Sequence, residues 1–177
     1  MSGHGTAIPM TAHKSGPLKG TAAVPGDKSI SHRALIFGAM AIGETTITGL
    51  LDARDTQLMM AGLRLLGNEV HVTDHDAVGN LTATVTPHFM RGPVSIDVGL
   101  AGTVMRFVPP LASLATGCVD FDGDPRARER PLGPMLDSLR ALGVTISDAQ
   151  GYLPMSIEGS GSVRGGAVDI DASASSQ

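Results

Sequence analysis

Aromatic side chains are scarce in this 177-residue sequence: tryptophan is absent, and Phe and Tyr together make up 3% of the residues. A core must therefore be built from aliphatic side chains and the nine methionines, whose flexible side chains fill irregular core space. With 42% apolar residues, a chain of this length can bury a sizeable core. We therefore expect one domain or a large part of a bigger one.

The sequence also has only one cysteine, no histidines at the spacing of metal ligands and no excess of basic residues. The single Cys118 excludes a disulfide framework within the chain, and we interpret it as a small core residue at the start of a strand. The histidines show no metal-ligand spacing, and we expect His32 on a helix surface. The formal charge of −4 argues against binding to nucleic acid or anionic membranes. We therefore expect no metal and neither of these partners.

Long apolar runs are absent too, because every run is far shorter than the roughly 20 residues that span a bilayer. Residues 1–16 have no apolar segment typical of a secretion signal. One cysteine and no targeting segment together predict a cytoplasmic location.

Apolar periodicity and turn residues predict alternating strands and helices. In residues 21–90 they predict a strand at 21–25, a helix at 29–42 before Gly43, a strand at 45–49, a helix at 55–67 closed by Gly67, and a hairpin of 69–74 and 80–86. In residues 91–160 they predict a strand at 94–98, a helix at 103–116 bent or delayed by Pro109 and Pro110, a strand at 118–123, a helix at 131–142 with Pro131 at its first position, and a hairpin of 144–147 and 152–158.

The two halves share residues at a fixed offset. Gly43, Gly49, Ala53, Arg54 and Leu58 lie 74 positions before Gly117, Gly123, Ala127, Arg128 and Leu132. This predicts an α/β fold of repeated β-α-β-α-β-β units at about 21–90 and 91–160. Because Ile170 repeats Ile96, we expect a third unit to begin at 166–177 and to be truncated. A strand without its helix leaves an apolar face uncovered, so we expect an incomplete piece.

The same offset relates Lys28, Gly102 and Ser176, each between a first strand and its helix. Around a pseudo-threefold axis, three helix N-termini would converge, and their free N–H groups favour phosphate or carboxylate. Taken singly, Ser29 or Ser31 is better explained as a helix cap, Lys28 as a solvated side chain and Gly102 as a turn glycine. The shared spacing favours an anion site instead.

A second cationic segment, DGDPRARERPLG (122–133), contains Arg126, Arg128 and Arg130. A guanidinium can bind carboxylate or phosphate through two parallel hydrogen bonds. The alternative is a solvated turn whose arginines are neutralised by its own acidic residues. Since Arg128 repeats Arg54, we expect it to pair with an acidic neighbour, and we leave the role of Arg126 open.

Four segments then occur in the order and spacing of one family: PGDKSISHRAL, LAGTVMRF, GDPRARERPLGPMLDSLRALG and DASASSQ. From about residue 18 to its end, the sequence closely resembles the N-terminal part of the 3-phosphoshikimate 1-carboxyvinyltransferase (EPSP synthase) family. The resemblance implies an enolpyruvyl transferase (inverse α/β barrel) fold, with two domains of three units each and substrates bound between them. Residues 1–20 would pair with the missing second domain, residues 21–177 would form part of the other, and the full-length protein would be a monomer.

The resemblance also implies a reaction. The family transfers the enolpyruvyl group of phosphoenolpyruvate to the 5-hydroxyl of shikimate 3-phosphate in chorismate and aromatic amino acid biosynthesis, uses no cofactor, and is the target of glyphosate. By motif, Lys28 would contact both substrates, and Gly102 and Arg130 would bind phosphoenolpyruvate. The residues implied for shikimate 3-phosphate are Ser29, Arg33, Ser175, Ser176 and Gln177. The general acid and base groups would lie in the missing part, so no catalytic residue is assigned and the chain alone is expected to be inactive.

Two positions depart from the family pattern, and two other functions stay open. Leu100 stands where many relatives have Asn, and Phe107 where Pro or Leu is frequent; their effects, including on glyphosate sensitivity, are left open. The related UDP-N-acetylglucosamine enolpyruvyl transferases pair their Lys with Asn and carry a Cys in the loop matching 122–131. Here Ser29 follows Lys28 and the loop has no Cys, which disfavours that alternative. A non-catalytic anion-binding fragment is the other alternative.

Overall fold

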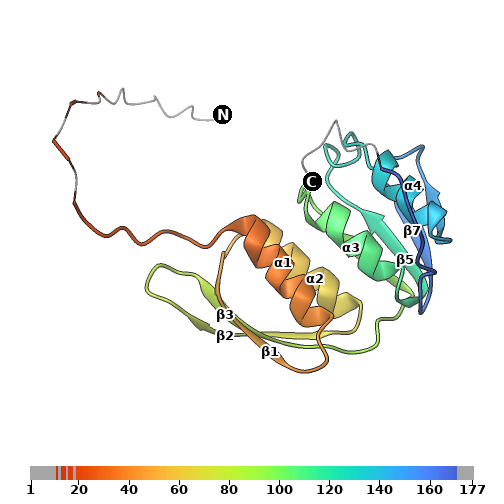
Figure 1. Cartoon of the computed structure of the whole chain (residues 1–177), viewed down its shortest axis with the longest axis horizontal. Helices are drawn as coiled ribbons and strands as arrows, with labels where there is room; N and C mark the ends of the chain where they lie inside the picture. Colours follow the sequence, from red (N-terminus) through yellow and green to blue (C-terminus); the bar gives the residue numbers. More distant parts are fainter. Residues whose placement is uncertain (1–10, 12, 15, 18, 171–177) are drawn as a thin grey trace, which may run out of the picture.

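Two β-sheets lie on the outside of the molecule with helices between them (Figure 1). The structure is a computed structural model that describes residues 11, 13, 14, 16, 17 and 19–170. Its elements run in two groups. The first is α1 (Lys28–Ala39), β1 (Thr45–Leu50), α2 (Arg54–Leu65), β2 (Glu69–His75) and β3 (Leu81–Thr86). The second is β4 (Val94–Asp97), α3 (Val104–Ala112), β5 (Thr116–Asp122), α4 (Gly133–Ala141), β6 (Thr145–Asp148) and β7 (Met155–Ser160).

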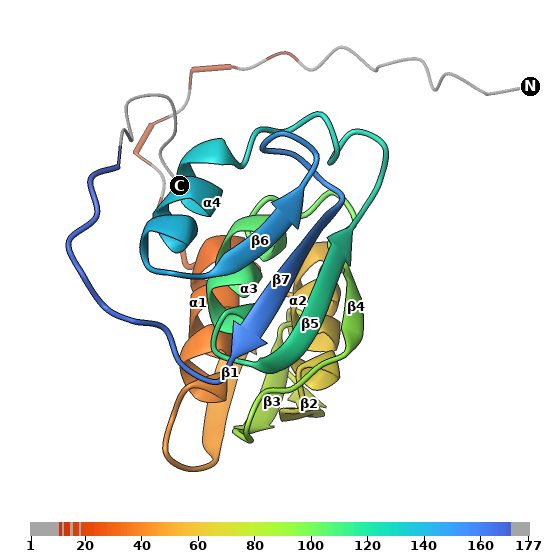
Figure 2. The same cartoon turned by 90° about the vertical axis from the view of Figure 1, so that its right-hand side faces the viewer.

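The two sheets have matching strand orders. The first is β1-β3-β2, and the second is β4-β5-β7-β6, in which β4 runs parallel to β5 and the other pairs are antiparallel. Helices α1 and α2 contact the first sheet, whereas α3 and α4 contact β7 and β6 of the second. Figure 2 shows the second sheet in front of α3. The predicted α/β class and both predicted hairpins are confirmed.

The start of α1 is capped by an aspartate rather than by a serine. The Asp27 carboxylate accepts a 2.7 Å hydrogen bond from the backbone N–H of Ile30. The Ser31 hydroxyl donates to the Asp27 carbonyl at 2.7 Å and accepts from the backbone N–H of Leu51 at 2.9 Å. Ser31 therefore ties the start of α1 to the end of β1, and neither Ser29 nor Ser31 is the N-cap.

Several predicted element bounds are wrong. Residues 21–25 are exposed and form no strand. In the second sheet β4 pairs with β5, but among the described strands the equivalent edge of β1 has no partner, because β1 pairs only with β3. Helix α4 begins at Gly133 rather than at Pro131, because the Leu132 N–H donates to the Gly151 carbonyl at 2.8 Å and holds the preceding segment in a turn. Helix α3 is not delayed by its prolines, which lie in its last turn.

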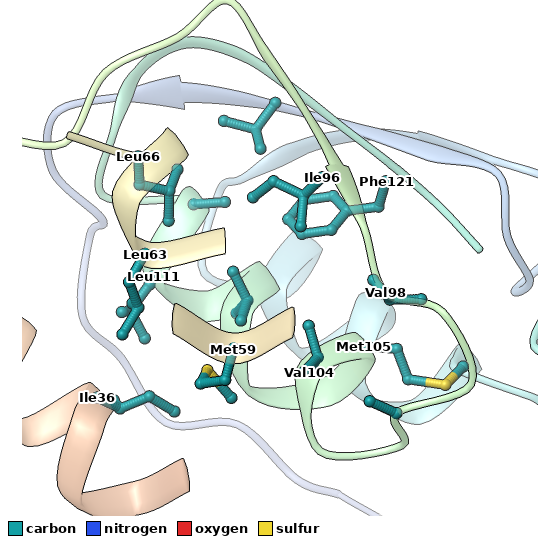
Figure 3. Close-up of a cluster of buried hydrophobic side chains, with 14 of the residues drawn as sticks. Ile36, Met59, Leu63, Leu66, Ile96, Val98, Val104, Met105, Leu111 and Phe121 are labelled. Atoms are coloured by element: carbon teal, nitrogen blue, oxygen red, sulfur yellow. The ribbon is translucent and has the colours of Figure 1, made fainter. Parts of the chain in front are cut away.

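The core is packed where α2 meets α3 and β4 (Figure 3). Met59 and Leu63 of α2 are fully buried, as are Val104 of α3 and Ile96 of β4. Phe121 of β5 is 1% exposed and lies beside Ile96, its partner across the two strands, so this core includes one buried aromatic ring among aliphatic and methionine side chains (Figure 3). Cys118 is half-buried on β5 and not in this core, contrary to expectation.

His32 is fully buried and not on the helix surface as expected. Its Nδ1 atom shares a 2.5 Å hydrogen bond with Oγ1 of Thr103, the residue before α3, so the start of α3 covers this face of α1. Its Nε2 atom has no hydrogen-bond partner among the described residues. Burial lowers the pKa of His32 to about 4; Asp55 acts in the opposite direction, and Lys28 lowers the pKa further.

The buried imidazole makes stability depend on pH. The folded chain binds a proton at His32 with a pKa of about 4, whereas the unfolded chain does so near 6.5. The unfolded state therefore gains protons first as the pH falls, and folding stability is full above about pH 6.5 and declines toward pH 4. For wild type, we expect the His32 contribution to lower the free energy of unfolding by about 2 kcal/mol between pH 7 and pH 5.

Denaturant unfolding of His32→Asn, His71→Asn and wild type at the two pH values measures this contribution. His71→Asn is the control, because that side chain is 68% exposed, and it should keep the wild-type pH dependence. His32→Asn should lose the His32 share of that dependence. Equal dependence in wild type and His32→Asn would contradict the burial of a neutral ring.

Candidate anion site at the helix starts

The start of α1 presents a cationic group next to α2. Lys28 is the first residue of α1, and its Nζ atom lies 3.0 Å from Oδ2 of Asp55 in the first turn of α2. The Lys28 side chain is 49% exposed, so it is accessible to a ligand while Asp55 orients it. Arg33 is exposed, and its Nη1 donates to the Ser29 carbonyl at 3.2 Å. Ser29 and Arg33 therefore share one face of α1, one turn apart, as predicted.

Two guanidinium groups lie over Gly102, just before α3. A Cβ atom placed on Gly102 would lie 3.0 Å from Nη1 of Arg130 and 3.2 Å from Nη1 of Arg106. Their own hydrogen bonds are long: Arg130 donates to the Leu100 carbonyl at 3.3 Å, and Arg106 donates to the Gly102 carbonyl at 3.4 Å. The close neighbours of Gly102 are thus the ends of two cationic side chains, and its φ is not among the positive values.

In the described part of the chain, neither Arg106 nor Arg130 forms an ion pair with a carboxylate. Burial lowers the pKa of Arg106, and the positive charge of Arg130 lowers it further. An anion between the guanidiniums would relieve this repulsion and complete their hydrogen bonding.

Other arginines of the same region are already paired. Arg54 contacts both oxygens of Asp124 at 3.0 and 3.2 Å, and Arg128 contacts both oxygens of Asp122 at 2.8 and 2.6 Å. These contacts raise the pKa of both arginines, and Arg128 lowers the pKa of Asp122. The predicted pairing of Arg128 with an acidic neighbour is confirmed. Of the loop arginines, Arg130 is the one that lies over Gly102.

Side-chain contacts hold the starts of α1 and α3 next to each other. His32 of α1 contacts Thr103, the residue before α3. The guanidinium of the next residue, Arg33, lies 5.0 Å from the centre of the Phe107 ring in the first turn of α3. Figure 1 shows the two helices starting at the same end of the molecule. The site residues of the two units thus lie at one end of the helix layer, whereas Ser175, Ser176 and Gln177 lie outside the described residues.

A hollow of about 430 Å³ is lined by Asp97, Asp122 and Asp124, of which Asp122 pairs with Arg128 and Asp124 with Arg54. Among the described residues its lining includes no Lys or Arg, so it offers an anion no cationic donor. Cys118 is equally unsuited to nucleophilic chemistry, because a hydrogen bond with Glu158 and then burial raise the pKa of its thiol to about 11.

Within the described ranges, His, Cys, Asp and Glu side chains form no group of three able to hold a metal ion. None of the helices described has both the length and the apolar character that crossing a membrane requires.

The sequence alone did not identify three contributors to this region. Asp55, His32 and Arg106 act through partners far away in the chain, so their roles depended on the fold. For Arg106 a local indication existed: it stands four residues after Gly102, one turn into the predicted helix.

The comparisons with known proteins agree on one family. The profile of EPSP synthase (3-phosphoshikimate 1-carboxyvinyltransferase) matches residues 12–177. The 3-phosphoshikimate 1-carboxyvinyltransferase of Kocuria rhizophila is 49% identical over 166 residues, which cover 91% of this chain and 37% of that relative.

Solved structures give the same result. A structure of EPSP synthase from Acinetobacter baumannii has a TM-score of 0.75 and 30% identity, covering 85% of this chain and 34% of that one. A second structure of EPSP synthase from that organism has a TM-score of 0.71 and 31% identity, covering 80% and 32% of the two chains. This chain thus spans about a third of the length of these relatives, and it belongs to the EPSP synthase (3-phosphoshikimate 1-carboxyvinyltransferase) family.

Proposed function

We propose that this chain supplies one wall of an enolpyruvyl transferase site that binds phosphoenolpyruvate and shikimate 3-phosphate. The observation that carries the proposal is the pair of guanidiniums over Gly102 without a carboxylate partner among the described residues. Both substrates carry phosphate and carboxylate groups, which match guanidinium donors and helix N-termini. Family membership supports the same substrates.

The two helix starts divide the substrates between them. Gly102 allows the phosphoenolpyruvate to approach the backbone closely, while Arg130 and Arg106 bind its negative charge. Ser29 and Arg33 bind shikimate 3-phosphate from α1. Lys28 lies in the first turn of α1 and contacts both substrates, exchanging its contact with Asp55 for a substrate oxygen. Ser175, Ser176 and Gln177 stay predicted contacts for shikimate 3-phosphate.

The reaction proceeds by addition and elimination. The 5-hydroxyl group of shikimate 3-phosphate loses its proton as its oxygen bonds to C2 of phosphoenolpyruvate, and the opened C2=C3 double bond accepts a proton at C3. Loss of a C3 proton then restores the double bond as the C2–oxygen bond to phosphate breaks. In this scheme the chain binds and orients both anions and neutralises their repulsion. His32 does not transfer these protons, because its ring is buried and its lowered pKa keeps it neutral.

The proton-transfer groups are expected in a complementary C-terminal domain, and the location of the protein is expected to be cytoplasmic. A non-catalytic anion-binding role is the second candidate, because the described residues include binding groups and no assigned general acid or base. Binding and turnover assays separate the two functions.

Shikimate 3-phosphate binding tests the α1 half of the site. By isothermal titration calorimetry, Lys28→Ala and Arg33→Ala should each weaken binding at least tenfold, since each removes a charge-assisted hydrogen bond. Lys14→Ala is the control for a lost exposed positive charge and should bind like wild type. Binding that neither substitution changes would favour a ligand site elsewhere on the chain.

Phosphoenolpyruvate binding tests the α3 half. Gly102→Ala places a methyl group 3.0 and 3.2 Å from the two guanidiniums, where the anion would lie. With shikimate 3-phosphate saturating, we expect at least tenfold weaker phosphoenolpyruvate binding in a calorimetric titration. Gly43→Ala adds the same methyl group with no atom within 4 Å and should have no effect. Equal affinities in all three proteins would contradict this placement.

Turnover tests whether this wall is sufficient for catalysis. The isolated 177-residue chain should release no phosphate above background from the two substrates, because it lacks assigned proton-transfer groups. A phosphate-release assay beside a full-length relative measures this. Activity comparable to that relative would show that the chain carries a complete catalytic site.

A further inference from the structure

The Arg33 guanidinium lies over an aromatic face. Its central carbon is 5.0 Å from the centre of the Phe107 ring, which is within the range of a cation–π interaction. Arg33 belongs to α1 and Phe107 to α3, so the contact joins residues 74 positions apart in the chain. It is the second side-chain link between these helix starts, next to the contact of His32 with Thr103.

The ring is held more firmly than the arginine. Phe107 is partly buried and packs against the hydrophobic core, whereas Arg33 is exposed. Apart from its contact with the ring, Arg33 donates one 3.2 Å hydrogen bond within the described ranges, from Nη1 to the Ser29 carbonyl. A fixed aromatic face therefore limits where this long, exposed side chain can lie.

Stacking on a ring leaves the guanidinium donors available. Attraction to the ring face uses the charge and the plane of the group, whereas its N–H groups point outward in that plane. A carboxylate partner would occupy those donors, as Asp122 does for Arg128. Phe107 can thus orient Arg33 without competing with an anionic ligand, and it reduces the entropy lost when Arg33 binds one.

We propose that Phe107 is a positioning residue for the shikimate 3-phosphate half of the site, acting through Arg33. This inference rests on the proposed function, because it takes Arg33 as a ligand of that substrate. Phe107 follows Arg106 directly, so neighbouring residues of α3 serve the two halves: Arg106 extends toward Gly102, and Phe107 supports Arg33.

Substitution at Phe107 tests the proposal by two measurements. Phe107→Leu keeps an apolar side chain and removes the ring face, whereas Phe107→Tyr keeps the face. By calorimetric titration, Phe107→Leu should bind shikimate 3-phosphate about two- to fivefold more weakly than wild type, and Phe107→Tyr should restore wild-type affinity. Affinity for phosphoenolpyruvate should change less than twofold in both variants. General damage to α3 would instead weaken phosphoenolpyruvate binding as well.

The second measurement needs no ligand. In the free chain, the Arg33 side-chain resonances, assigned with Arg33→Lys, should show a ring-current shift that Phe107→Leu removes and Phe107→Tyr retains. Phe89→Leu is the matched control, because Phe89 is 99% exposed, and it should change neither the affinity nor these resonances.

The outcomes separate the two proposals. Unchanged affinity in Phe107→Leu, or Arg33 resonances that do not move, would overturn the positioning role and leave the proposed function intact. Failure of the wild-type chain to bind shikimate 3-phosphate would overturn the proposed function and this role with it, even if the resonances show that the ring contacts Arg33.

Discussion

The arrangement of the site depends on a buried hydrogen bond between His32 of α1 and Thr103 before α3. Both side chains are almost completely buried, so the bond forms away from solvent, where losing one partner is costly. It fixes the start of α3 against the first turns of α1. Lys28 stands one turn before the histidine, and Gly102 immediately precedes the threonine. This contact thus links the two halves of the site, together with the Arg33–Phe107 contact and the packing of α2 against both α1 and α3.

Charge pairing then separates structural from available arginines. Arg54 and Arg128 each contact two oxygens of one carboxylate, and these contacts stabilise the loops around the acidic hollow. Arg106 and Arg130 lie over the same glycine and form no ion pair within the described ranges. Each guanidinium has five N–H donors, and only one or two of them contact a backbone carbonyl, at 3.3 to 3.5 Å. The remaining donors are available to an anion.

Repeated sequence does not produce repeated environments. Ile30 and Phe37 of α1 are 69% and 70% exposed, whereas Val104 and Leu111, 74 positions later on α3, are 0% and 5% exposed. The difference arises because α3 packs against α2 of the preceding unit. The corresponding face of α1 has no such neighbour among the described helices. Equivalent positions therefore contribute differently to the core, although their local sequences predict the same helix.

The order of the elements from α1 onward, the internal 74-residue offset and the residues at the helix starts were determined by the sequence itself. Periodicity, turn glycines and the 74-residue offset are local or internal properties of the chain, and the family motifs are read directly. Gly67, with φ of 112° after α2, illustrates a local requirement that was predicted and confirmed. These patterns do not show which residues far apart in the sequence contact each other in the fold.

Only the tertiary structure showed these long-range contacts. It buried His32, paired Arg128 with Asp122 and brought Arg106 and Arg130 together over Gly102. It also left residues 21–25 without a partner among the described strands. In each case the outcome depends on which segment approaches from elsewhere in the chain. The dielectric environment, the counter-charge and the available hydrogen bonds of a side chain follow from that approach and not from its neighbours in sequence.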